Sequence, residues 1–155
     1  MHSKIFQVSS SPITEDNEMH ESRFDDVNRD VFDYVTEVKE QDSIISDYEW
    51  LNHVEGIEVN LEEKTFTVDK KKYFKVKHEK FIEQLEKLKN CTLEEFSSNK
   101  LYYDVLELKD AFDDKYSFYI DDDNEYFGLT TLDNFVRHTE PNNKYYLGQV
   151  FDYHF

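Results

Sequence analysis

The sequence has few of the residues on which disulfide frameworks, phosphate-binding loops and membrane spans depend. Its 155 residues include one cysteine, Cys91, three glycines and two prolines. A single cysteine excludes a disulfide framework within one chain, and three scattered glycines exclude a glycine-rich phosphate loop. No stretch approaches ~18 consecutive apolar residues, and the opening MHSKIFQVSS lacks the apolar run of a signal peptide. These absences predict a soluble protein in the cytoplasm of its host cell.

Aromatic residues, by contrast, are abundant. Thirteen Phe, eleven Tyr and one Trp make up 16% of a chain whose hydrophobic content is only 38%. Because each aromatic side chain can bury ~150–250 Å², these residues supply much of the core. A chain of this length fits one domain. We therefore predict a single folded acidic domain over residues 1–155 rather than a disordered chain.

The spacing of apolar residues predicts both helices and strands. Intervals of three and four residues, with capping residues before them, predict helices over 28–38, 43–51, 78–90, 92–112 and 131–138. Alternation predicts strands over 4–8, 57–59, 66–68, 116–120, 126–129 and 145–155. The mixture predicts an α+β domain, with an antiparallel sheet of about four to six strands packed with four or five helices. The Thr92–Glu95 stretch matches a capping box.

Negative charge is the strongest feature of the sequence. Thirty-five acidic residues against 18 basic ones give a net charge of −17, divided into −10 over 1–55, +1 over 56–100 and −8 over 101–155. Such a chain repels nucleic acid and anionic membranes and attracts basic proteins. The lysine run Lys70–Lys72 lies among acidic residues, so we expect the solvated edge of a hairpin there rather than a nucleic-acid contact.

Carboxylates concentrate in three stretches, which we predict to form the partner-binding surface. The first follows helical spacing: Asp26, Asp30, Asp33, Glu37 and Glu40. The second follows one face of the predicted 92–112 helix and the residues after it: Asp104, Glu107, Asp110, Asp113 and Asp114. The third is the predicted hairpin turn: Asp121, Asp122, Asp123 and Glu125. Each stretch taken alone also fits an ordinary solvated helix face or turn.

The acidic turn departs from a calcium-binding loop. Counted from Asp121, an EF-hand needs glycine at position 6 and glutamate at position 12, where this chain has Tyr126 and Leu132. The six histidines show no HxH or HExxH spacing, and the chain has no GxSxG, GxGxxG or GxxxxGK[ST] motif. We therefore predict no catalytic residues, no metal and no cofactor. A nonstandard cation site at the turn is the alternative.

In size, charge and aromatic content the chain resembles the small acidic inhibitors of phages and mobile elements, the anti-CRISPR and antirestriction proteins that mimic DNA. The resemblance implies a non-catalytic inhibitor that occupies the basic nucleic-acid groove of a bacterial defence protein, a Cas nuclease or a restriction enzyme. The alternative is an immunity protein or antitoxin that neutralises a basic nuclease toxin. In either case the expected partner is a basic nucleic-acid-binding protein, with no direct contact to nucleic acid or membrane.

The sequence leaves the oligomeric state open between monomer and homodimer. A homodimer could form if the alternating stretch 145–155 paired with the same strand of a second chain.

Overall fold

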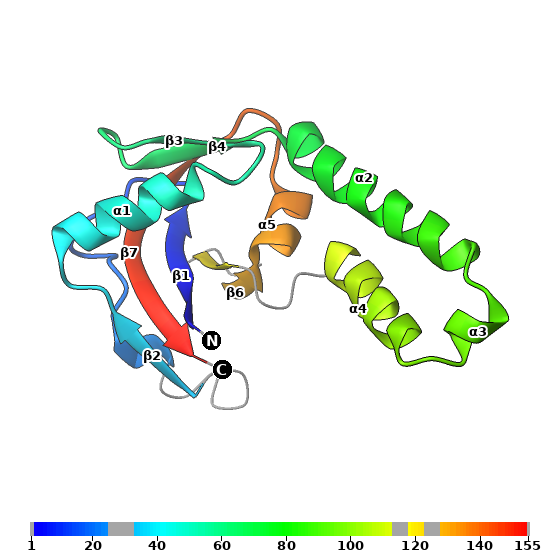
Figure 1. Cartoon of the computed structure of the whole chain (residues 1–155). Coiled ribbons are helices and arrows are strands. Elements are labelled where there is room, and N and C mark those ends of the chain that lie inside the picture. The colour runs from blue at the N-terminus through cyan, green and yellow to red at the C-terminus, as the bar shows by residue number, and fades with distance from the viewer. Residues whose placement is uncertain (1, 25–32, 113–117, 123–127, 155) are drawn as a thin grey trace.

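The computed structural model describes residues 2–24, 33–112, 118–122 and 128–154. Within these residues five α-helices, one short 3-10 helix and a seven-stranded, mostly antiparallel sheet form a mixed fold, shown in Figure 1. The α+β class and the five helices confirm the prediction, and the sheet has seven strands where we expected about four to six.

The sheet is built around its longest and last strand. In chain order the strands are β1 (His2–Ser9), β2 (Tyr34–Glu37), β3 (Ile57–Asn60), β4 (Thr65–Val68), β5 (Tyr119–Asp122), β6 (Gly128–Thr131) and β7 (Lys144–His154). The main order is β3-β4-β7-β1-β5-β6, and only the β1–β5 pair among the described strands is parallel. Along its other edge β7 pairs with β4 through 144–146 and with β2 through 151–154. Both edges of β7 are therefore occupied, which removes pairing through 145–155 as a route to a homodimer.

Some of the predicted helix starts are confirmed, and others are wrong. They are η1 (Glu21–Phe24), α1 (Gln41–Leu51), α2 (Lys70–Lys89), α3 (Leu93–Phe96), α4 (Lys100–Phe112) and α5 (Leu132–His138). The capping box at Thr92 and the cap at Thr131 are confirmed. Helix α1 begins two residues before the predicted start at 43, with no side-chain cap, and the helix predicted over 92–112 is divided into α3 and α4. Asp69 caps α2 by accepting a hydrogen bond of 3.0 Å from the Lys72 amide, so this helix begins eight residues before the predicted start. Lys70–Lys72 consequently form its first turn, and the predicted hairpin edge is wrong.

The predicted helix over 28–38 is also wrong where the structure describes it. Residues 34–37 form β2, in which Val35 lies opposite Tyr153 of β7. Val35 and Thr36 are β-branched and suit a strand. Pairing with β7 lets Val35 pack against a buried cluster, so a nonlocal contact prevails over the local helical spacing.

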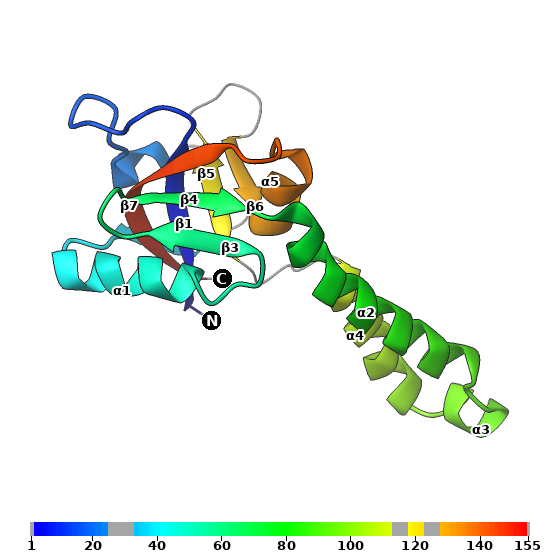
Figure 2. The ribbon, with the colours of Figure 1, turned by 90° about the horizontal axis from the view of Figure 1, so that it is seen from above.

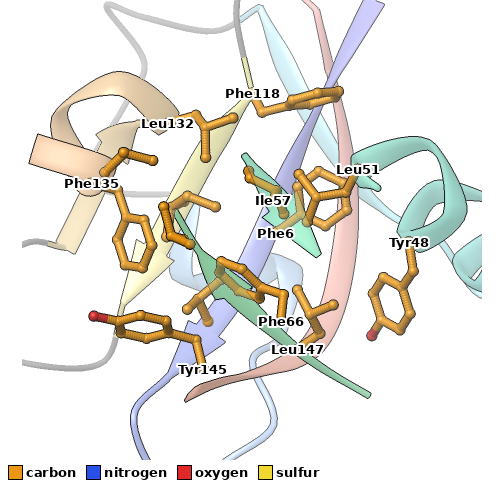
Figure 3. Close-up of a cluster of buried hydrophobic side chains, with 14 of the residues drawn as sticks. Phe6, Tyr48, Leu51, Ile57, Phe66, Phe118, Leu132, Phe135, Tyr145 and Leu147 are labelled. Carbon is orange, nitrogen blue, oxygen red and sulfur yellow. The ribbon is translucent and has the colours of Figure 1, made fainter. Parts of the chain in front are cut away.

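Aromatic side chains fill the core on both faces of the sheet. On one face α1 and α5 cover Phe6 of β1 and Phe66 of β4, as Figure 3 shows. On the other face Ile5, Phe151 and Tyr153 pack against the segment that contains η1. Neighbouring residues of a strand point to opposite faces, which is why adjacent positions of β1 belong to different clusters.

Three helices leave the sheet together. Figures 1 and 2 show α2, α3 and α4 projecting as a helical hairpin, which we call the helical arm (residues 70–112); the rest of the chain is the sheet body. Asp133 of α5 joins the two regions, because its carboxylate accepts hydrogen bonds from the Tyr73 hydroxyl and, at 2.7 Å, from Lys77 Nζ. The Arg137 guanidinium lies 4.7 Å from the centre of the Phe74 ring.

Candidate functional site

The net charge divides sharply between the two regions. The helical arm holds ten lysines against eight acidic residues, a net charge of +2. The rest of the chain holds eight basic residues against 27 acidic ones, a net charge of −19. The excess of negative charge therefore lies entirely outside the helical arm.

Six carboxylates of the sheet body gather where the 10–24 segment meets β2 and the start of α1. We call this set the acidic face: Glu15, Glu18, Glu21, Glu37, Glu40 and Asp42. The backbone amide of Glu37 donates a hydrogen bond of 3.2 Å to the Glu21 carboxylate. Glu15 and Glu18 line a hollow of about 300 Å³ together with Gln41 of α1. The tertiary fold thus joins acidic residues from three separate stretches of sequence.

These carboxylates are mostly exposed to solvent, with two lysines nearby: Lys64 lines the same hollow, and Lys39 lies between Glu37 and Glu40 in the sequence. Among the residues that the structure describes, none of the six takes part in an ion pair, and all are exposed except the half-buried Glu37. Glu40 and Asp42 lie at the start of α1, where the helix dipole favours negative charge and offsets part of their mutual repulsion. The acidic face therefore presents carboxylates that are not held in ion pairs by other described residues.

A buried glutamine fixes the segment that carries Glu15 and Glu18. Gln7 of β1 is fully buried, and its Oε1 accepts hydrogen bonds of 3.1 Å from the amides of Met19 and Gln149. Its Nε2 donates to the Asn17 carbonyl at 2.7 Å. A buried amide with all these partners holds the segment in one position against the sheet.

A second glutamine fixes the other half of the acidic face. Gln149 Nε2 donates to Glu37 Oε1 at 3.0 Å and to the Val38 carbonyl at 2.8 Å. Beside it, the Tyr48 hydroxyl donates to the Gly148 carbonyl. Burial raises the pKa of Tyr48, and the carboxylates of Glu18 and Asp47 raise it further, so the hydroxyl stays a donor. The carboxylates on both sides of the hollow thus rest on a rigid polar support.

The first predicted acidic group is partly represented in this face. Glu37 and Glu40 belong to it, although they lie on a strand and a loop rather than on one helix. Asp33 is exposed just before β2, where its carboxylate lies 3.2 Å from His154 Nδ1. Asp26 and Asp30 lie outside the described residues. Sequence reasoning missed the carboxylates of the 10–24 segment, because no spacing along the chain links them to Glu37.

The second predicted group of carboxylates lies on the helical arm. Two of its members pair with a lysine of the arm rather than facing a partner. Asp104 is half-buried, 2.6 Å from Lys87 Nζ, and Glu107 lies 3.7 Å from the same atom. The hydrogen bond from Asp104 is the main reason that the pKa of Lys87 is raised. Asp110 is exposed on α4, and Asp113 and Asp114 lie outside the described residues.

The third predicted group is not an exposed turn where the structure describes it. Asp121 and Asp122 belong to β5 and are buried, so their predicted place on the binding surface is wrong. Asp121 accepts two hydrogen bonds from the guanidinium of Arg23, at 3.0 and 3.2 Å. This paired geometry explains how a carboxylate is accommodated inside the sheet body. Asp123 and Glu125 lie outside the described residues.

The structure also bears on metal binding and on membrane insertion. Across 2–24, 33–112, 118–122 and 128–154, no group of three or more His, Cys, Asp or Glu side chains is placed to hold a metal ion. The same described ranges contain no helix with the length and apolar character to cross a membrane. Comparisons of the chain with protein-family models, with curated proteins and with solved structures found no match.

Proposed function

We propose that this protein is a non-catalytic inhibitor whose sheet body occupies the basic nucleic-acid groove of a bacterial defence protein, a Cas nuclease or a restriction enzyme, by mimicking DNA. The observation that carries the proposal is the acidic face, six carboxylates with no ion pair among the described residues, on a region of net charge −19. Duplex DNA presents one negative charge per ~1.7 Å of its axis, and grooves that bind it offer lysine and arginine in return.

The support beneath the acidic face favours binding over a flexible acidic tail. Gln7 and Gln149 hold carboxylates of the face on a sheet, so little conformational entropy is lost when a partner binds. Exposed ion pairs contribute only ~0.2–1 kcal/mol each, so the face acts chiefly through long-range attraction, a fast association rate and specificity. Binding is therefore expected to weaken steeply as salt concentration rises.

The first experiment captures the partner and asks whether DNA competes. The immobilised protein is exposed to a bacterial host lysate at low salt, and bound protein is eluted with duplex DNA. The proposal expects a basic nuclease that DNA displaces and whose DNA cleavage the purified protein inhibits. Capture of a toxin nuclease instead would indicate the immunity protein or antitoxin. Retention of a protein that DNA does not displace would contradict mimicry.

Charge reversal then locates the contact. In the double variant Glu15→Lys/Glu18→Lys, the affinity for the captured nuclease should fall roughly tenfold or more, because both residues are exposed on the acidic face. The matched control, Glu83→Lys/Asp110→Lys, makes the same charge change at exposed positions of the helical arm. Equal losses of affinity in both variants would show that binding depends on the net charge of the chain and not on the acidic face.

A further inference from the structure

The helical arm carries most of the exposed large apolar side chains. Thirteen such side chains are exposed in the described residues, and nine of them belong to the arm. Six cluster in residues 93–106, and we call them the arm patch: Leu93, Phe96, Tyr102, Tyr103, Val105 and Leu106. Leu93 is 83% exposed and Phe96 67%. Apolar side chains gathered in this way mark an interaction surface.

Helix α4 is apolar on two sides. Leu101 and Leu108 are half-buried and Ala111 is buried, on the side that faces α2. Tyr102 and Leu106 are one turn apart on the other side and are exposed. A helix at the surface of a protein has one apolar stripe and one polar face, so a helix that is apolar on both sides is covered on both.

Charge indicates which partner covers the arm patch. The sheet body, at −19, repels a second copy of itself, whereas the arm is close to neutral at +2. Helix α4 runs back beside α2, since Asp104 pairs with Lys87 and Ala111 lines one pocket with Phe81. The half of the arm next to the sheet body is therefore residues 70–84 and 107–112, with seven lysines and four acidic residues, a net charge of +3. The distal half, residues 85–106, holds three lysines and four acidic residues, a net charge of −1. One arm is therefore complementary to another arm that runs in the opposite direction.

We propose that two copies of this chain associate through their helical arms, packed antiparallel into a four-helix assembly. This inference does not rest on the proposed function. Antiparallel packing brings the half of each arm that carries +3 against the half of the other that carries −1. It also places the two sheet bodies at opposite ends, farther apart than the Debye length of ~8 Å. Parallel packing would put like charges together in both regions.

The shapes of the helices fit this arrangement. Helix α2 has 20 residues and α4 has 13, so α2 extends roughly 10 Å beyond α4, and Figure 2 shows it continuing toward the sheet body. Val76 is 50% exposed on that part of α2. In the antiparallel pair the partner's tip, with Leu93 and Phe96, covers it. Six side chains of this size on each copy can bury on the order of 1,000 Å² in total, enough for a specific interface.

Sedimentation of the full chain tests the association. The protein should be a dimer at micromolar concentration, and Leu106→Glu should raise the dimer dissociation constant roughly tenfold or more, because it places a charge in an apolar interface. Tyr103→Glu, also exposed, should do the same. The matched control is Leu61→Glu, which changes an exposed leucine of the sheet body and should leave the constant unchanged. Circular dichroism checks that each variant keeps its helices.

The single cysteine tests the direction of packing. Cys91 lies at the tip of the arm, between α2 and α3, and takes a spin label. In an antiparallel dimer each tip covers Val76 of the other copy, 15 residues before Cys91, so the two labels lie roughly 22 Å apart or more. Labels within about 12 Å of each other would overturn the arrangement, since a parallel pair holds its tips together at the spacing of packed helices. So would a chain that stays monomeric up to about 100 μM, or a dimer that Leu106→Glu and Tyr103→Glu leave intact.

Discussion

The sheet body and the helical arm differ in burial and in charge together. Of 23 buried hydrophobic residues in the described chain, 21 belong to the sheet body, and the arm contributes only Tyr73 and Ala111. The sheet body carries −19, yet the arm is close to neutral and exposes the arm patch. A large aromatic core lets the sheet body tolerate strong self-repulsion, whereas the arm has little core and little charge. The two regions are therefore suited to different partners.

The largest expected difference between the two regions is in the free energy of unfolding that each loses when a phenylalanine is replaced by alanine. Phe66→Ala should lower the free energy of unfolding by about 3–5 kcal/mol, because Phe66 is 1% exposed and packs against Phe135 and Tyr145. Phe96→Ala in the arm should change it by about 0.5 kcal/mol or less. Urea unfolding at a concentration where the chain is monomeric measures both. Similar losses would mean that the arm has a core comparable to that of the sheet body.

A smaller effect is expected where the two regions join. Asp133→Ala removes the buried carboxylate that Tyr73 and Lys77 share, and should lower the free energy of unfolding by about 2–3 kcal/mol. Because this carboxylate anchors the start of α2, amide hydrogen exchange in that part of α2 should speed up more than in β1. The control Asp110→Ala, at an exposed site of α4, should change stability by about 0.5 kcal/mol or less. Equal exchange in α2 and β1 would show that the joint has no local role.

The smallest effect is expected at the tip of the arm. Thr92→Ala removes the capping box of α3 and should cost about 1 kcal/mol of local helix stability. In the native chain the hydrogen bond from the Thr92 amide holds the pKa of Glu95 below its ordinary value. The capping box is therefore intact at neutral pH. The stability that the Glu95 carboxylate gives to α3 is lost as pH falls through the lowered pKa of Glu95.

Carboxyl NMR follows this titration directly. The Glu95 midpoint should move up toward the ordinary glutamate value in Thr92→Ala, because Oγ1 of Thr92 lies 3.1 Å from the carboxylate and also fixes its position beside the amide. Glu94→Gln serves as the control, since Glu94 lies outside the box, and it should leave the midpoint in place. A midpoint that does not move in Thr92→Ala would contradict the capping origin of the shift.

Local patterns were sufficient for most elements but not for the acidic face. The capping residues Thr92 and Thr131 predicted the starts of α3 and α5, and the alternation of apolar residues predicted β3, β4 and β7. Both signals depend only on residues that are close in the chain. The helix predicted over 28–38 fails at β2 because residues 34–37 find a strand partner more than 110 residues away. Likewise, the burial of Asp121 depends on Arg23, 98 positions earlier.

The sequence by itself determined the net charge, its concentration outside residues 70–112, and an aromatic supply large enough for a core. Only the tertiary structure decided which carboxylates meet. It buries Asp121 and Asp122 in β5, turns Asp104 toward Lys87, and brings Glu15 and Glu18 to the start of α1. The physical reason is that net charge and secondary-structure propensity follow from the residues in their order along the chain. Burial and ion pairing depend instead on strand register and on loops that meet across the sheet.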